Sequence, residues 1–311
     1  MRIGIGIGEI SGAGGALDTM IAEVQRAEQD GFASAWFANI FGVDAITFAA
    51  LCGRVTQRIE LGTAVVPTFP RHPVAMAQQA LTAQAAAGGR FTLGIGLSHQ
   101  VVIETMLGLS FARPFSHMQE YMAVLAPLIR DGSANFEGGE FRVHASVSVP
   151  GARPCPILLA ALAPRMLALA GRVGDGTITW MTGPKTLREY TVPRITEAAS
   201  TAGRPAPRIV AGMPVAVTED AAGARAAAAQ QFQIYGALPS YRAMLDREGA
   251  AAPEDIAIIG DESAVSERIA QFAAIGVTDF LGIPYAFGPD KRGAIERTRA
   301  LLVREAKRAG R

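Results

Sequence analysis

The sequence predicts a single (β/α)8 barrel, and two observations support this fold class. Eight short runs rich in β-branched and apolar residues alternate with alanine-rich amphipathic runs, the order typical of parallel βα units. The chain of 311 residues is 50% hydrophobic and 18% charged, which suffices for the large core of a barrel. No Ser/Gly linker or run of charges divides it, so residues 1–311 are expected to form one domain.

The expected strands are short apolar runs bounded by turn-forming residues. They lie at residues 2–8, 34–38, 59–66, 91–96, 156–161, 177–180, 209–217 and 278–283. Because eight such strands alternate with helices, a closed barrel is favoured over an open doubly wound sheet.

The expected helices show apolar residues at helical spacing. They lie at residues 16–30, 44–55, 73–87, 117–130, 164–173, 185–202, 219–234, 263–275 and 289–308. Two segments exceed this simple repeat. Residues 135–150, after the fourth strand, are expected to form a hairpin on an extended loop. Residues 235–258 contain a helix at 240–247 and are expected to cover one face of the barrel.

Composition and the missing motifs exclude several classes of function. With 29 basic and 28 acidic residues and no basic stripe, nucleic-acid binding is not expected. No signal peptide and no apolar run long enough for a transmembrane helix is found. Cys52 and Cys155 are far apart and form no CxxC pair, and we expect them to be structural thiols of a reduced, cytoplasmic protein. No metal-ligand spacing, nucleophile elbow or Rossmann fingerprint is present.

The fourth expected strand ends in the most informative sequence of the chain, Gly94-Ile95-Gly96-Leu97-Ser98-His99. Glycines at a strand end allow a flat ligand to approach the backbone closely. In an α/β barrel, residues that follow a strand lie where the chemistry takes place. The alternative is an ordinary strand end with a solvated Ser-His turn.

Several segments together resemble the bacterial luciferase-like family, and within it the oxidoreductases that use the deazaflavin coenzyme F420. The resemblance runs nearly from end to end and is carried by residues 1–4, 36–39, 61–65, 71–73, 89–96, 160–166 and 174–184. It implies a luciferase-like TIM barrel with an insertion after strand four. It also implies a flavin or deazaflavin at the C-terminal strand ends, a small-molecule substrate and a homodimer.

The resemblance also assigns residues to the cofactor site. It implies that the Ala64–Val65 peptide bond is cis and forms a bulge behind the cofactor ring, the alternative being an ordinary strand end before Pro67. The full set of expected cofactor-binding residues is Asn39, Ala64, Val65, Gly96, Leu97, Ser98, His99, Ala160, Ala161, Leu162, Ala163, Arg165 and Met166.

His99 and Asn39 are the expected catalytic residues. A histidine can donate to a ring oxygen or move a proton near neutral pH, and His99 is preferred over His72, His117 and His144 for this role. Asn39 lies beside the ring or the substrate, or else forms a turn or helix cap. In related deazaflavin enzymes this position is often acidic, and an amide cannot take up a proton.

Two further segments complete the expected site. The loop 160–166 resembles the phosphate loop of the family. Pro164 lies near the first turn of the following helix, where free N–H groups bind anions and Arg165 can add a positive charge. The alternative is an ordinary strand-to-helix turn. Trp180 and Met181 either wall a flat substrate pocket or belong to the core.

These observations predict an F420-dependent oxidoreductase that transfers a hydride between the deazaflavin C5 and a small organic substrate. Reduction of a C=C, C=N or C=O bond by the reduced cofactor is the expected direction, and oxidation of an alcohol stays open. The first alternative is an FMN-dependent luciferase-like monooxygenase. The second is a barrel that binds a flavin without catalysis.

Overall fold

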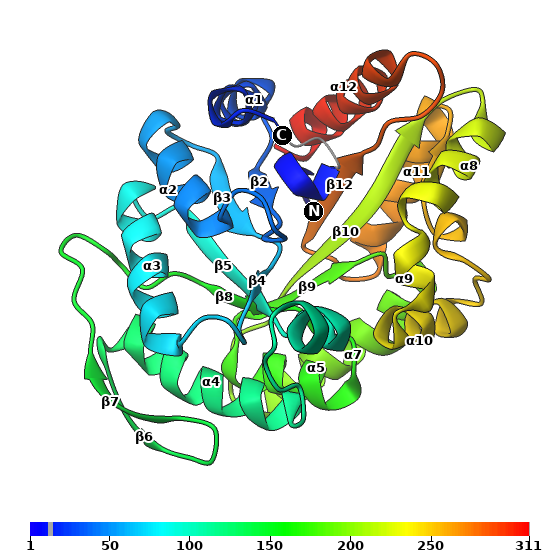
Figure 1. Ribbon diagram of the computed structural model, residues 1–311. Helices are drawn as coiled ribbons and strands as arrows, with labels where there is room; N and C mark the ends of the chain where they lie inside the picture. The colour runs from blue at the N-terminus through cyan, green and yellow to red at the C-terminus, as the bar shows by residue number, and fades with distance from the viewer. Residues whose placement is uncertain (12–14, 311) are drawn as a thin grey trace.

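Eight parallel strands close into a barrel in the computed structural model, which describes residues 1–11 and 15–310 (Figure 1). Neighbouring strands pair in parallel around the ring, and β12 closes it by pairing with both β10 and β1. The predicted (β/α)8 barrel is therefore confirmed. The ring consists of β1 (Arg2–Gly6), β2 (Ser34–Phe37), β3 (Glu60–Thr63), β5 (Phe91–Gly96), β8 (Ile157–Leu159), β9 (Gly176–Trp180), β10 (Arg208–Val217) and β12 (Asp279–Pro284).

An outer layer of helices covers the barrel (Figure 1). Aspartates cap four of them, each accepting a hydrogen bond from the N–H three residues ahead, which satisfies an otherwise free donor. The main helices are α1 (Leu17–Asp30), α2 (Ala45–Val55), α3 (Pro73–Ala86), α4 (Pro114–Arg130), α5 (Pro164–Val173), α7 (Val192–Thr201), α8 (Ala221–Gln231), α11 (Glu262–Ala274) and α12 (Lys291–Ala309).

Two segments lie outside the simple repeat. The predicted hairpin after the fourth barrel strand is present as β6 (Ser133–Glu137) and β7 (Arg142–Ser146), which projects beside α4 (Figure 1). The predicted excursion contains α9 (Gln233–Ala237) and α10 (Pro239–Glu248).

The strands differ from the prediction in two places. The expected strand 59–66 is divided into β3 and β4 (Val66–Pro67), because the chain leaves the ring at Ala64 and Val65. A strand that was not among those predicted, β11 (Ile258–Gly260), follows the excursion and pairs with the far end of β10. At ten residues, β10 is long enough to pair with β9, β12 and β11 in succession.

The barrel interior is filled by apolar side chains around a tryptophan. Trp36 is fully buried, and its Nε1 donates to Ser34 Oγ at 2.9 Å. A Cβ on Gly62 would lie 2.4 Å from the Trp36 ring, so glycine is required to accommodate the indole. The other members of this cluster are Leu158, Ile178, Val210, Leu281 and Ile283.

Charged side chains close the N-terminal end of the barrel. Arg208 donates to both Asp279 carboxylate oxygens, at 3.0 and 2.6 Å, and also pairs with Glu60. Arg2 and Thr92 donate to Glu60 as well. Burial alone would raise the pKa of Glu60, but Arg208 and Arg2 outweigh it and the pKa lies below its ordinary value. This ion network was not predicted from the sequence.

The predictions for the cysteines, for membrane-spanning helices and for the homodimer can each be compared with the structure. Both cysteines are buried free thiols, and burial raises their pKa to about 12. Among the described helices, none combines the length and the apolar character that crossing a membrane requires. The homodimer stays a prediction, because a single chain is described.

Candidate active site at the barrel mouth

Three strand ends meet closely at the C-terminal mouth of the barrel. A Cβ on Gly96 would lie 2.8 Å from Val65 Cγ2 and 3.2 Å from Ala160 Cβ, so a side chain there would displace its neighbours. Ala64 and Val65 are half-buried and pack on the barrel interior. The Ala64–Val65 peptide bond is cis, as the family resemblance implied. The structure therefore brings together four of the predicted cofactor-binding residues around bare backbone.

Two strand ends at this mouth carry left-handed backbone. Within the described parts of the chain, Ser98 (φ 62°) and Met181 (φ 48°) are the non-glycine residues with positive φ. Such conformations cost free energy in L-residues and occur often at functional sites. Ser98 directly precedes His99, and Met181 directly follows Trp180. These two turns therefore set the direction of the chain next to His99 and Trp180, the two side chains that the sequence analysis singled out at these strand ends.

His99 is half-buried at the end of β5. Its carbonyl accepts hydrogen bonds from Val102 and Ile103 N–H at 2.9 and 3.0 Å, which fix it at the start of the π-helical turn Val101–Met106. Burial lowers the pKa of its imidazole. His99 is therefore neutral at pH 7, with one ring nitrogen as a donor and the other as an acceptor. Leu97 and Ser98 beside it are half-buried as well.

The other three histidines have structural partners. His72 caps α3, its Nδ1 accepting a hydrogen bond from Val74 N–H at 3.3 Å. The predicted helix starts at residue 117, but α4 already begins at Pro114, so His117 lies inside its first turn. Its ring is buried, stacks on Phe69 at 3.9 Å and bonds Thr68. Burial lowers the pKa of His117 to about 4. The exposed His144 bonds within the hairpin.

Asn39 follows β2 and holds the start of α2. Its Oδ1 accepts from Ala45 N–H at 3.1 Å and lies 3.5 Å from the Arg71 guanidinium, which also pairs with Asp44. This is the capping arrangement that the sequence offered as an alternative. Because its amide oxygen is already engaged, a direct role for Asn39 toward a cofactor or substrate stays a prediction.

The loop 160–166 leads from β8 into α5. Ala163 is the N-cap but supplies no side-chain cap, so the first N–H groups of α5 are free to bind an anion. Arg165 is exposed, and its guanidinium stacks on the Phe115 ring at 3.9 Å. Ala161 and Met166 are buried. Only their backbone can contact a ligand, whereas Ala160 and Leu162 are half-buried.

The two residues after β9 have different environments. Met181 is 2% exposed and packs in the main core, so its side chain does not wall an open pocket. Trp180 is half-buried and packs on the same interior cluster as Ala64 and Val65. Sequence reasoning missed Tyr235 and Tyr241, whose rings extend this region from α9 and α10. The only sequence signal for them was that two tyrosines lie in residues 235–258, the segment outside the regular alternation of strands and helices.

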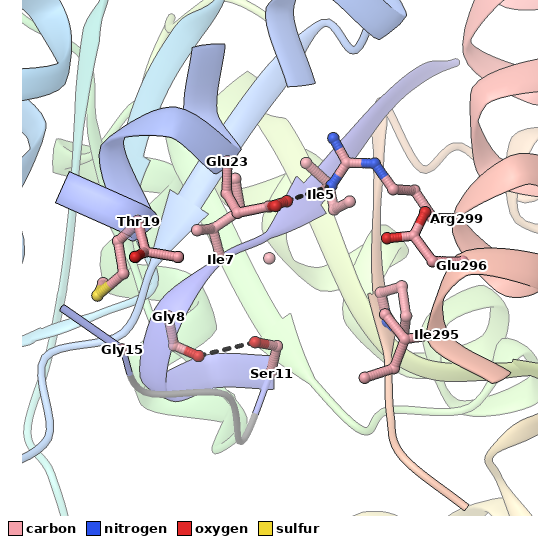
Figure 2. Close-up of a pocket in the computed structure, with 13 residues that line it drawn as sticks. Ile5, Ile7, Gly8, Ser11, Gly15, Thr19, Glu23, Ile295, Glu296 and Arg299 are labelled. Atoms are coloured by element: carbon pink, nitrogen blue, oxygen red, sulfur yellow. Dashed lines mark hydrogen bonds and ion pairs between the residues drawn. The ribbon is translucent and has the colours of Figure 1, made fainter. Parts of the chain in front are cut away.

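A separate cavity of about 260 Å³ lies outside the barrel wall, between β1, α1 and α12 (Figure 2). Most of its polar side chains already have hydrogen-bond partners. Glu23 bonds Arg299 at 3.0 Å, and Ser11 Oγ donates to the Gly8 carbonyl at 2.8 Å. It shares no residue with the strand ends described above, so we assign it no part in the candidate site.

The mouth suits a ligand that is flat at one end and anionic at the other. Bare backbone at Gly96, with the small side chains of Ala64 and Ala160, permits a ring to approach closely. The uncapped α5 lies directly beyond Ala160 and offers N–H donors together with Arg165. Within residues 1–11 and 15–310, no group of three His, Cys, Asp or Glu side chains could hold a metal ion.

Comparison with known proteins gives a family match and several relatives. A family model described as luciferase-like monooxygenase matches residues 2–279. A Mycobacterium tuberculosis protein, provisionally named a coenzyme F420-dependent oxidoreductase, is 31% identical over 181 residues, or 54% of this chain. The match spans only 52% of that relative.

Two solved structures share the fold. The coenzyme F420-dependent tetrahydromethanopterin reductase of Methanopyrus kandleri aligns with a TM-score of 0.79 at 23% identity, over 99% of both chains. The oxygenating constituent of the Pseudomonas putida 3,6-diketocamphane monooxygenase, in complex with FMN, aligns with a TM-score of 0.77 at 16% identity. The second alignment covers 98% of this chain and 97% of that one.

Proposed function

Because this chain belongs to the luciferase-like monooxygenase family, we propose that it is an F420-dependent oxidoreductase acting on a small organic substrate. The observation that carries the proposal is the barrel mouth, where bare backbone at Gly96 meets Val65 and Ala160 beside the uncapped helix α5. The 31% identity to a relative named for F420 supports this cofactor over FMN.

The described residues divide into two groups that would hold the cofactor. Ala64, Val65, Gly96 and Ala160 would contact the ring, and the N-terminus of α5 with Arg165 would bind a phosphate. When bound, F420 supplies or accepts a hydride at C5. Neither reduction of a C=C, C=N or C=O bond nor oxidation of an alcohol is favoured by the residues themselves.

His99 is the group we assign to proton transfer. It directly follows the β5 end that forms the mouth, and its neutral imidazole has both a donor and an acceptor. Asn39 carries an amide and cannot exchange a proton at this step. The half-buried Trp180 borders the same mouth and contributes an apolar wall.

Binding measurements with the two cofactors test the proposal. We expect the purified chain to bind F420 with a lower Kd than FMN, both titrated into the same preparation and followed by isothermal calorimetry. Tighter binding of FMN would instead favour a luciferase-like monooxygenase. The shared fold with a monooxygenase in complex with FMN is the observation behind this second candidate. Tight F420 binding without turnover of any enone, imine, ketone or alcohol would favour a non-catalytic barrel.

Arg165→Ala is expected to raise the Kd for F420 about tenfold or more, because a charge-assisted hydrogen bond contributes ~1.5–3 kcal/mol. The side chain is exposed and stacks on Phe115, so its removal should not unfold the protein. Arg172→Ala is the matched control, since this exposed arginine lies in the last turn of the same helix. An unchanged Kd for Arg165→Ala would remove this residue from the phosphate site.

A further inference from the structure

The segment of residues 68–71, which follows β4, contacts two of the residues that the sequence predicts to bind the cofactor. Thr68 N–H donates to the Gly96 carbonyl at 2.9 Å and so continues the pairing of β4 with the end of β5. At the other end of the segment, the Arg71 guanidinium lies 3.5 Å from Asn39 Oδ1. The segment therefore connects the residue that ends β5 with the residue that follows β2 at the barrel mouth.

Two side chains of α4 hold this segment at both of its ends. His117 Nε2 forms a hydrogen bond with Thr68 Oγ1 at 3.1 Å, and the Tyr121 hydroxyl donates to the Arg71 carbonyl at 2.9 Å. His117 and Tyr121 are four residues apart on the helix, so their side chains lie on the same face of it. One face of α4 thus fixes the two residues that contact Gly96 and Asn39.

These contacts are shielded from water by aromatic packing. Thr68 and Tyr121 are fully buried, and His117 is 7% exposed. The His117 ring stacks on Phe69 at 3.9 Å, and Phe141 packs against the rings of His117 and Tyr121 at 5.3 and 5.7 Å. A buried polar group that loses its partner is costly, because water does not replace the partner. The bonds from α4 are therefore expected to hold the segment firmly.

The imidazole of His117 is neutral at pH 7. Burial lowers its pKa to about 4, although the carboxylate of Glu120 opposes this shift. A neutral imidazole has one donor and one acceptor, and the Thr68 hydroxyl can take either role. The bond between the two side chains therefore forms with either tautomer of the ring, and its strength is not tied to a charge at this pH.

We propose that His117 and Tyr121 are positioning residues for the cofactor ring, which hold Gly96 and Asn39 in place through the segment 68–71. The inference rests on the proposed function, because Gly96 is an expected contact of the ring. A flat ring that lies on bare backbone tolerates little displacement of that backbone, so the groups that fix it matter for affinity. Both side chains act through the segment and need not touch the cofactor.

Thr68→Val and His117→Phe each remove one partner of the same bond and keep a side chain of similar shape. Each should raise the Kd for F420 by ~2–10-fold at pH 7, the range of one net hydrogen bond. The double variant should bind no more weakly than the weaker single variant, because both changes remove one bond. Thr68→Ser and His117→Gln keep a hydrogen-bonding group and should retain most of the affinity. Wild-type affinity in both single variants, or additive losses in the double variant, would overturn the proposal.

Tyr121→Phe has a matched control in Tyr285→Phe. The hydroxyl of Tyr285 is also buried and donates to the Ala224 carbonyl on α8 at 3.0 Å, so this control removes a comparable bond that does not involve the segment 68–71. Both variants should have a lower melting temperature, but only Tyr121→Phe should raise the Kd for F420, again by ~2–10-fold. Equal effects on the Kd would mean that a general loss of stability weakens binding, and the inference would be wrong.

Amide hydrogen exchange, followed by mass spectrometry, tests the positioning without any cofactor. Thr68→Val, His117→Phe and Tyr121→Phe should each speed exchange in peptides that cover residues 66–72 by ~2–10-fold, whereas Tyr285→Phe should not. Unchanged exchange in the three variants would contradict the inference whichever cofactor binds. Faster exchange without a change in cofactor affinity would mean that α4 only stabilises the segment, and the inference would again be wrong.

Titration of FMN into the same variants separates this inference from the proposed function. If FMN binds to the wild type and F420 does not, and the three variants weaken FMN binding, the F420 assignment fails and the positioning role stands. If F420 binds equally well to the wild type and to the variants, only the inference fails. If the wild type binds neither cofactor, both fail.

Discussion

Replacing His99 by alanine is expected to lower kcat at least about a hundredfold, because a positioned acid or base contributes ~10²–10⁴-fold. The residue lies directly after the β5 end that forms the candidate mouth. Hydride transfer to carbon leaves a negative charge that must be protonated. The F420 affinity should change little, since the predicted ring contacts come from Val65, Gly96 and Ala160. Turnover is measured with a substrate found by screening enones, imines and ketones.

The pH profile gives an independent test of this role. Burial lowers the pKa of His99, so the imidazole is neutral at pH 7 and becomes protonated only in more acidic solution. If protonated His99 is the donor, kcat rises as the pH falls through that lowered pKa. His99→Gln should lose this rise, because an amide does not titrate in this range.

A matched control separates the chemistry from a general effect of losing a histidine. His144→Ala removes an exposed imidazole in the hairpin β6–β7, which bonds Asn135 and Glu137, and should leave kcat unchanged. Wild-type turnover by His99→Ala would mean that His99 only lines the site and that solvent supplies the proton.

The sequence predicted those parts of the fold that depend on local pattern. The bounds of β5 and α5 agree with the predicted ranges because each begins and ends at strong signals, Gly96 for the strand and Pro164 for the helix. The closeness of Gly96, Val65 and Ala160 follows from the parallel order of the strands. Sequence pattern thus sufficed to place the mouth.

Features that depend on contacts distant in sequence could not be predicted. Tyr241 reaches His99 only because the excursion folds back over the mouth, and the irregular segment 235–258 has no periodicity to reveal this. For Asn39 the sequence left two roles open, and the bond to Ala45 N–H became visible only in three dimensions. Single charged residues at strand starts, such as Arg208, gave no sign that they form a network.

Arg208→Met is expected to lower the free energy of unfolding by ~3–5 kcal/mol, because it removes the main counterion of two buried carboxylates and leaves them only the more exposed Arg2. Asp279 is 2% exposed and accepts two hydrogen bonds from Arg208, and Glu60 is paired with the same guanidinium. These side chains join the starts of β3, β10 and β12. Urea unfolding followed by circular dichroism measures the loss.

The exposed pair of Arg142 and Glu137 provides the control for this substitution. Its two side chains are 79% and 63% exposed, so Arg142→Met should change the free energy of unfolding by less than ~1 kcal/mol. The pH dependence of the stability loss in Arg208→Met shows whether charge or packing causes it.

Arg208 and Arg2 hold the pKa of Glu60 below 4.5, so this carboxylate stabilises the fold above that pH and ceases to do so as the pH falls through its lowered pKa. The stability difference between wild type and Arg208→Met should therefore be full at pH 7 and shrink in acid. A difference of the same size at both pH values would mean that Arg208 stabilises the barrel through packing on Trp36, 5.4 Å away, rather than through charge.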